Sequence, residues 1–150
     1  MNAIILGMKA ATVKQILSGK KKAELMKKRP SLLELPIKVY IYEQKGELRN
    51  RPRISYTTYR RDGRGMVVGE CVCSRIQTID PSAIDENIKN ILHMKAREIT
   101  ESLGGKMGYI FFFSDVKAYD RPMGIEAFGK RRPPAPWCRV EEKQWNKEES

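Results

Sequence analysis

Two short stretches of the sequence combine residue types that can do chemistry. The first runs from Ser18 to Pro30, SGKKKAELMKKRP, where six basic residues surround a single carboxylate, Glu24. A carboxylate beside lysines can accept a hydrogen bond from the amino group of a nucleobase while the lysines bind phosphate oxygens. An exposed salt bridge on a solvated loop has the same composition, and the spacing alone leaves both interpretations open.

The second stretch is centred on Glu70, in MVVGECVCSRIQTI. A strand here would place Val67, Gly69, Cys71 and Cys73 on one face, and would put Glu70 on the other face between two valines, Val68 and Val72. A carboxylate between apolar side chains must be paired or have a raised pKa, and such groups are enriched at functional sites. Glu70 is therefore a candidate site residue.

The elements around the first stretch decide how its charges are presented. Val13 and Ile16 share one face of a helix in ATVKQIL, and Gly19 stands where a helix end favours a left-handed residue. The basic stretch thus begins where a helix stops. If it continues as an extended chain, alternate residues share a face: Lys20, Lys22 and Glu24 on one, Lys21 and Ala23 on the other.

The remaining patterns predict strands and one broken helical region. Alternating or continuous apolar residues indicate strands over 3–8, 37–43, 66–79, 108–119 and 137–140. Apolar residues at helical spacing over 84–103 indicate a helical region capped by Asp80 or Ser82 and broken near His93. Helices and strands do not alternate regularly, which favours an α+β fold with a small mixed β-barrel flanked by helices. We expect one domain over residues 1–140, followed by a charged tail, 141–150.

The charge balance favours a polyanionic partner. Lys and Arg number 29 against 18 Asp and Glu, a formal net charge of +11. An arginine-rich loop with two tyrosines follows the strand over 37–43, and it supplies Arg60, Arg61 and Arg64 as candidate contacts to a nucleic-acid backbone. Aromatic rings near these charges can stack on bases.

Several classes of site are not indicated. Three cysteines and one histidine do not match zinc-site spacings, so no metal is expected. The stretch SGKKK lacks the first glycine of a phosphate-binding loop, and no dinucleotide fingerprint occurs, so no cofactor is implied. The apolar start of the chain has no charged leader region and is too short to span a bilayer. We expect a cytoplasmic protein without a membrane partner.

The motif Gly-x-Lys-x-x-Glu after a short helix, here Gly19, Lys21 and Glu24, is followed by GECVCS on a later strand and by RPMGIEAFG and PPAPWCRV. Together these resemble the ASCH domain of the PUA-like superfamily over nearly the whole chain. The family often has arginine two residues after the glutamate, where this sequence has Met26. The resemblance implies a small β-barrel whose motif lines a cleft between barrel and helix. It also implies a partner such as RNA, single-stranded nucleic acid or a modified nucleobase.

Two functions from different classes follow. A binding module would use the cleft and the arginine-rich loop on RNA, and its candidate residues are Lys20, Lys21, Lys22, Glu24, Tyr42, Arg60, Arg61, Arg64, Arg121 and Trp137. An enzyme would act on RNA as a ribonuclease, or on acetylcytidine as an amidohydrolase. The resemblance to such amidohydrolases would assign catalysis to Lys21, the position of Glu24, and Glu70, but the hydroxyl nucleophile they use is replaced here by a carboxylate.

Overall fold

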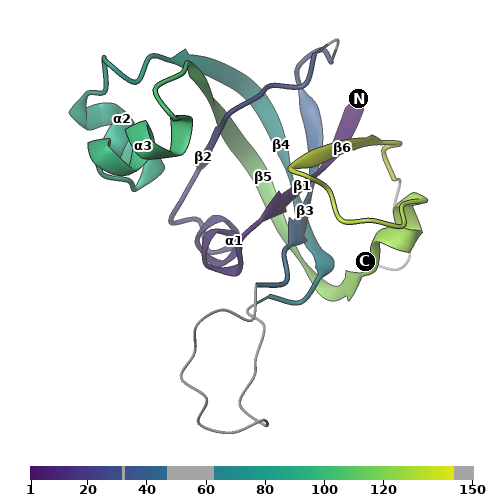
Figure 1. Ribbon diagram of the computed structural model, residues 1–150. Helices are drawn as coiled ribbons and strands as arrows, with labels where there is room; N and C mark the ends of the chain where they lie inside the picture. The colour runs from purple at the N-terminus through teal and green to yellow at the C-terminus, as the bar shows by residue number, and fades with distance from the viewer. Residues whose placement is uncertain (32, 47–62, 144–150) are drawn as a thin grey trace, which may run out of the picture.

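The structure is a computed structural model that describes residues 1–31, 33–46 and 63–143. It combines helices and strands in one α+β unit (Figure 1). In chain order the elements are β1 (Asn2–Met8), α1 (Ala10–Leu17), β2 (Ala23–Met26), β3 (Ile37–Glu43), β4 (Met66–Ile79), α2 (Glu86–Leu92), α3 (Ala96–Leu103), β5 (Gly108–Met123), the 3₁₀ helix η2 (Ile125–Phe128) and β6 (Trp137–Val140).

Six strands of the described chain form one mixed sheet in the order β2-β5-β4-β3-β1-β6. β1 runs parallel to β3, and the other neighbours are antiparallel. Met26 of β2 belongs to a core cluster that also contains residues of β1, β3, β4 and β5, and Trp137 of β6 packs against the same cluster. No ladder joins these two edge strands in the part of the chain that the structure describes.

The expected closed β-barrel is therefore wrong, although the α+β class is confirmed. The edge strands explain the difference. β2 and β6 have four residues each, and prolines stand close to both of them, Pro30 after β2 and Pro136 directly before β6. Proline has no backbone N–H to donate to a ladder, so short strands flanked by proline are poorly suited to closing a barrel.

The sheet has two buried faces. On one, Val13 and Ile16 of α1 pack against β1, β3, β4 and β5. On the other, Tyr40 of β3 packs with Ile125 and Phe128 of η2. The ring centroids of Tyr40 and Phe128 are 4.7 Å apart. We call these the α1 face and the η2 face.

A bulge in β4 makes the expected faces of Val67 and Val68 wrong. Gly69, Cys71 and Cys73 pair with residues of β3 that face α1, as the strand period predicted. The register shifts between Ile41 and Tyr42, however, so that Val67 lies on the η2 face and Val68 on the α1 face. The extra residue of the bulge exchanges the two valines, because one inserted residue reverses the alternation beyond it.

α2 and α3 lie side by side at one end of the sheet, apart from α1 (Figure 1). They cover a third cluster that includes Leu92, Ile99 and Ile110. The N-cap of α2 is Asp85, whose carboxylate accepts from Ile88 N at 2.8 Å. The expected caps Asp80 and Ser82 are wrong, because the Asp80 side chain closes a turn with Ser82 instead.

Candidate nucleic-acid interface

The end of α1 positions the Gly-x-Lys-x-x-Glu motif. α1 stops at Leu17, and Gly19 has φ +83°, a conformation that glycine adopts without a steric penalty. The chain then folds back, so that Lys21 N donates to Gln15 O at 3.1 Å before β2 begins at Ala23. The motif therefore bridges the end of α1 and the sheet.

Lys21 and Glu24 form a partly buried ion pair. Lys21 Nζ lies 3.3 Å from Glu24 Oε1, and the two side chains are 7% and 16% exposed. The same oxygen, Oε1, accepts from Leu25 N at 3.0 Å. The expectation that these two residues would lie on opposite faces is wrong, because Lys21 still belongs to the turn that leaves α1 and the strand alternation starts only at Ala23.

This pair keeps hydrogen-bonding capacity that the described residues do not use. The Lys21 ammonium carries three N–H donors, and within the described residues its side-chain partner is the carboxylate of Glu24. Both hydrogen bonds to Glu24 use Oε1, so within the described ranges Oε2 has no donor. A ligand that offers an acceptor to Lys21 and a donor to Glu24 would satisfy the unused hydrogen-bonding capacity of both side chains.

Exposed cations surround the pair. Lys20 and Lys22 are exposed on either side of the buried Lys21, and Lys27, Lys28 and Arg29 are exposed after β2. Between Lys9 and Arg29 the sequence has eight basic residues and Glu24 as its single acid. Met26, at the position where the resemblance would place arginine, is buried in the core of the α1 face and contributes no charge to the surface.

Glu70 lies on the other face of the sheet. Its partner across the β3–β4 ladder is Tyr40, which belongs to the η2 face, whereas Glu24 pairs with Phe111, which belongs to the core of the α1 face. Lys21, Glu24 and Glu70 therefore do not converge on one cavity. The amidohydrolase arrangement that the resemblance implied for these three residues is not formed.

Glu70 is instead part of a buried polar network. Its Oε2 forms an ion pair with Lys38 Nζ, and its Oε1 accepts from the Tyr119 hydroxyl at 2.8 Å. Burial alone raises the pKa of Glu70, but the hydrogen bonds from Lys38 and Tyr119 and the charges of Lys38 and Lys117 outweigh burial and lower the pKa. Of the two expected alternatives, paired or raised in pKa, the structure shows the paired state.

The other candidate residues are dispersed. Tyr42 is 4% exposed and packs in the core of the η2 face, so its ring is not presented for stacking on a base. Trp137 is half-buried against the core of the α1 face, while Arg64 and Arg121 are exposed. Arg60 and Arg61 lie outside the described residues.

The cysteines carry no sign of reactivity. Burial raises the pKa of the Cys71 thiol, and raises that of Cys73 to about 11, so both are protonated at neutral pH. Across residues 1–31, 33–46 and 63–143, His, Cys, Asp and Glu side chains do not gather in threes at any point where they could hold a metal ion. Nor is any helix of this described part long and apolar enough to cross a membrane.

Sequence reasoning missed Lys38 and Tyr119. Lys38 stands between two apolar residues in IKVYIYE, and the alternation of that strand placed it with the tyrosines. The pairing register that sets Glu70 beside Tyr40 was not readable from either strand alone. An isolated lysine on an apolar strand was the available signal that a carboxylate partner lay on a neighbouring strand.

The arrangement of strands and helices is similar to crystal structures of ASCH from Zymomonas mobilis. The superposition with that protein has a TM-score of 0.68 and 18% sequence identity, over 93% of this chain and 88% of the other. The chain has the fold of an ASCH domain protein.

Two mutants of the Zymomonas protein share this likeness. A serine-to-alanine mutant gives a TM-score of 0.68 at 18% identity over 93% of this chain and 89% of the other. A tyrosine-to-phenylalanine mutant gives 0.68 at 17% identity over 95% and 92%. No protein-family model matches the sequence, and a search of the curated proteins found no match. The ASCH fold is thus established by structure.

Proposed function

We propose that this chain is an RNA-binding protein that reads single-stranded RNA, or a single nucleobase, at the Lys21–Glu24 pair. The observation that carries the proposal is the partly buried pair with hydrogen-bonding capacity left over. Glu24 Oε2 can accept from the exocyclic amino group of a base, and Lys21 can donate to a base carbonyl or a phosphate oxygen. The ASCH fold and the basic surface are consistent with this role.

The surrounding charges suit a nucleic-acid backbone. Lys20, Lys22 and the exposed cations after β2 would contact phosphates without regard to sequence, while the Lys21–Glu24 pair would distinguish bases. Arg64 and Arg121 would extend the backbone contacts, although Arg121 lies in the half of β5 that is remote from β2 and the motif. The cleft between the sheet and α1 that the resemblance implies remains part of this proposal.

Catalysis receives less support than binding. An amidohydrolase at this motif would need a hydroxyl three residues after Lys21 and a carboxylate on the same face of the sheet, and the chain offers Glu24 and an oppositely facing Glu70. Ribonuclease activity, the other alternative, needs only a general base, an acid and a cation near a phosphate. Ribonuclease activity stays a prediction. RNA that is still intact after prolonged incubation with the protein would exclude it.

The test is a titration of labelled single-stranded RNA, followed by fluorescence anisotropy at several salt concentrations. About four phosphate contacts predict a log–log slope near −2.8, or roughly a fiftyfold loss of affinity over a fourfold rise in salt. Lys21→Met should lower the affinity about tenfold, because it removes a charge-assisted contact. Glu24→Gln should leave the slope unchanged and alter the order of preference among homopolymers.

The matched control is Arg132→Ala, which removes an exposed cation from the connection between η2 and β6; η2 packs on the face of the sheet opposite α1. It should bind like the wild type apart from a small electrostatic loss. Binding that is independent of salt, or equal losses for Lys21→Met and Arg132→Ala, would contradict the proposal.

A further inference from the structure

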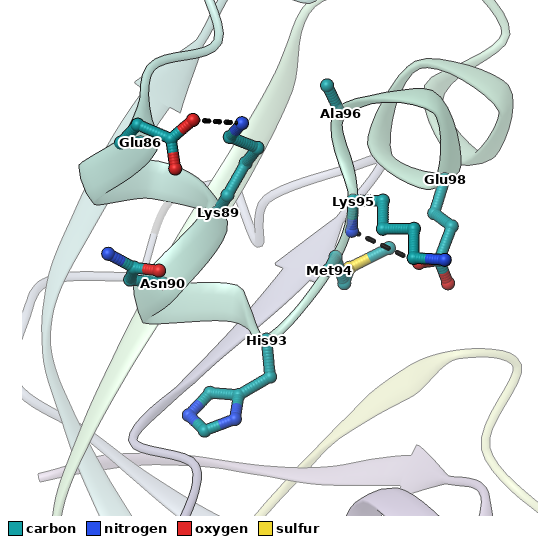
Figure 2. Close-up of a pocket in the computed structure, with 8 residues that line it drawn as sticks. All are labelled: Glu86, Lys89, Asn90, His93, Met94, Lys95, Ala96 and Glu98. Atoms are coloured by element: carbon teal, nitrogen blue, oxygen red, sulfur yellow. Dashed lines mark hydrogen bonds and ion pairs between the residues drawn. The ribbon is translucent and has the colours of Figure 1, made fainter.

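A hollow of about 620 Å³ lies between α2 and α3, outside the basic stretch (Figure 2). Its wall is formed by one side of α2, the connection between the helices, and the first turn of α3. Asn90 comes from α2, whereas His93 and Met94 come from the connection. The binding interpretation of the Lys21–Glu24 pair does not use any of these side chains.

The charges of the hollow are already matched. Glu86 forms an ion pair with Lys89, and Glu98 Oε1 accepts from Lys95 N at 3.1 Å, which places a carboxylate at the start of α3. An added phosphate would lie beside these two acids as well as beside Lys89 and Lys95, so the hollow offers an anion no net attraction. A neutral ligand fits this charge distribution better.

His93 occupies a left-handed backbone conformation that glycine holds at the ends of α3 and η2. The residue that ends α2 has φ 54° and ψ 42°, in the left-handed region. At the corresponding positions α3 ends with Gly104 and η2 ends with Gly129, both with positive φ. A side chain in this conformation costs about 1–2 kcal/mol relative to the right-handed form. Of these three helix ends, that of α2 carries an aromatic ring in place of glycine, and this ring of His93 lines the hollow.

The side chains that remain unmatched suit a flat heteroaromatic ring. His93 is exposed and can stack on a base, and the half-buried thioether of Met94 is polarisable and packs well against aromatic faces. Asn90 is exposed on α2 and carries both a donor and an acceptor, the combination that pairs with the edge of a base. Both side chains line the hollow, and Figure 2 shows Asn90 on α2 and the His93 ring just beyond the end of that helix.

We propose that the hollow between α2 and α3 is a second nucleobase site, in which a base stacks on His93 and is read by Asn90. The inference rests on the proposed function in that the base would come from bound single-stranded RNA or from a free nucleoside. It adds a binding site that is separate from the Lys21–Glu24 pair and independent of phosphate contacts.

The experiment is an NMR titration of the full chain with free adenosine, cytidine, guanosine and uridine, and with ribose 5-phosphate as the probe that lacks a base. The chain has a single histidine, so the ring signals of His93 are assigned without ambiguity. We expect saturable shifts of the His93 ring with at least one nucleoside and none with ribose 5-phosphate. A short single-stranded RNA should give the same shifts, and an abasic strand of equal length should not, which separates the two sources of the base.

His93→Gly and Asn90→Ala are the informative variants. His93→Gly removes the ring and relieves the left-handed backbone, so it should melt no lower than the wild type yet bind nucleoside about tenfold more weakly, as followed by the backbone amide signals of the residues that line the hollow. Asn90→Ala should change the order of preference among the four nucleosides. Nucleoside affinity unchanged in His93→Gly, equal shifts with ribose 5-phosphate, or no saturable shift at all would overturn the site.

The outcomes distinguish this site from the proposed function. Salt-dependent RNA binding without any effect of nucleosides on His93 removes the hollow as a site and leaves the Lys21–Glu24 proposal standing. Nucleoside-dependent shifts at His93, combined with RNA binding that ignores Lys21→Met, support the hollow and contradict the proposal for the pair.

Discussion

The buried pair of Glu70 and Lys38 should contribute to stability and not to ligand binding. Glu70 accepts from Lys38 and Tyr119 in a side chain that is 9% exposed, and Lys38 is 20% exposed. Hydrogen bonds to charged groups contribute about 1.5–3 kcal/mol each. Glu70→Gln keeps an acceptor for Tyr119 but turns an amide toward the Lys38 ammonium, so we expect a loss of about 2–3 kcal/mol in the free energy of unfolding.

The double variant Lys38→Met/Glu70→Leu is the decisive comparison. Apolar replacement of a buried ion pair is often neutral, because it removes the desolvation cost together with the attraction. The neighbours on the η2 face include Tyr40 and Val67, which are fully buried. Urea unfolding should therefore place the double variant within about 1 kcal/mol of the wild type. The single variants Lys38→Met and Glu70→Leu should each lose more stability than the double variant. If their losses in unfolding free energy simply added in the double variant, the ion pair would be refuted.

The same pair predicts a pH dependence of defined sign. The pKa of Glu70 is lower in the folded than in the unfolded chain, so its contribution to stability is present above about pH 5 and is lost as the pH falls through the folded pKa. The difference in unfolding free energy between wild type and Glu70→Gln should shrink on acidification. A difference that is constant from pH 7 to pH 3 would contradict the ionised, paired state.

Three further predictions concern the sheet, the loop and catalysis. Gly69→Ala should cost about 1–3 kcal/mol in urea unfolding, because an added Cβ would lie 2.6 Å from Lys117 O of β5 and 2.9 Å from Leu17 Cδ2 of α1. Wild-type stability would show that the β5 backbone and the Leu17 side chain can both move away. Simultaneous replacement of Arg60, Arg61 and Arg64 by Ala should weaken binding of all single-stranded RNAs alike and flatten the salt slope, and a selective loss for one sequence would contradict backbone contact. A chromatographic assay should detect no deacetylation of acetylcytidine above the buffer rate, and turnover that Lys21→Ala abolishes would reinstate a catalytic role for the motif.

Local patterns predicted most of the individual elements. The apolar periods identified α1, β1 and β3, because each of these elements buries the side chains that its own period selects. The break near His93 is also confirmed, since α2 ends there and α3 begins at Ala96. These features depend on residues close together in the sequence, where spacing and propensity act directly.

The features that failed depend on long-range pairing. The open sheet follows from how the short strands β2 and β6 end, and the exchange of Val67 and Val68 follows from a bulge opposite β3. The separation of Glu24 from Glu70 depends on the registers of two different strand pairs. A shift by one residue reverses the face of every following side chain, so no single strand contains that information.

The most direct test of the central claim is photo-crosslinking of the full chain to single-stranded RNA that contains 4-thiouridine, followed by mass spectrometry of the crosslinked peptides. The Lys21–Glu24 pair and the exposed lysines beside it predict crosslinks within residues 18–29, reduced in Lys21→Met and unchanged in Arg132→Ala. Crosslinks confined to the η2 face, around Lys117 and Tyr119, would contradict the assignment of RNA binding to the motif.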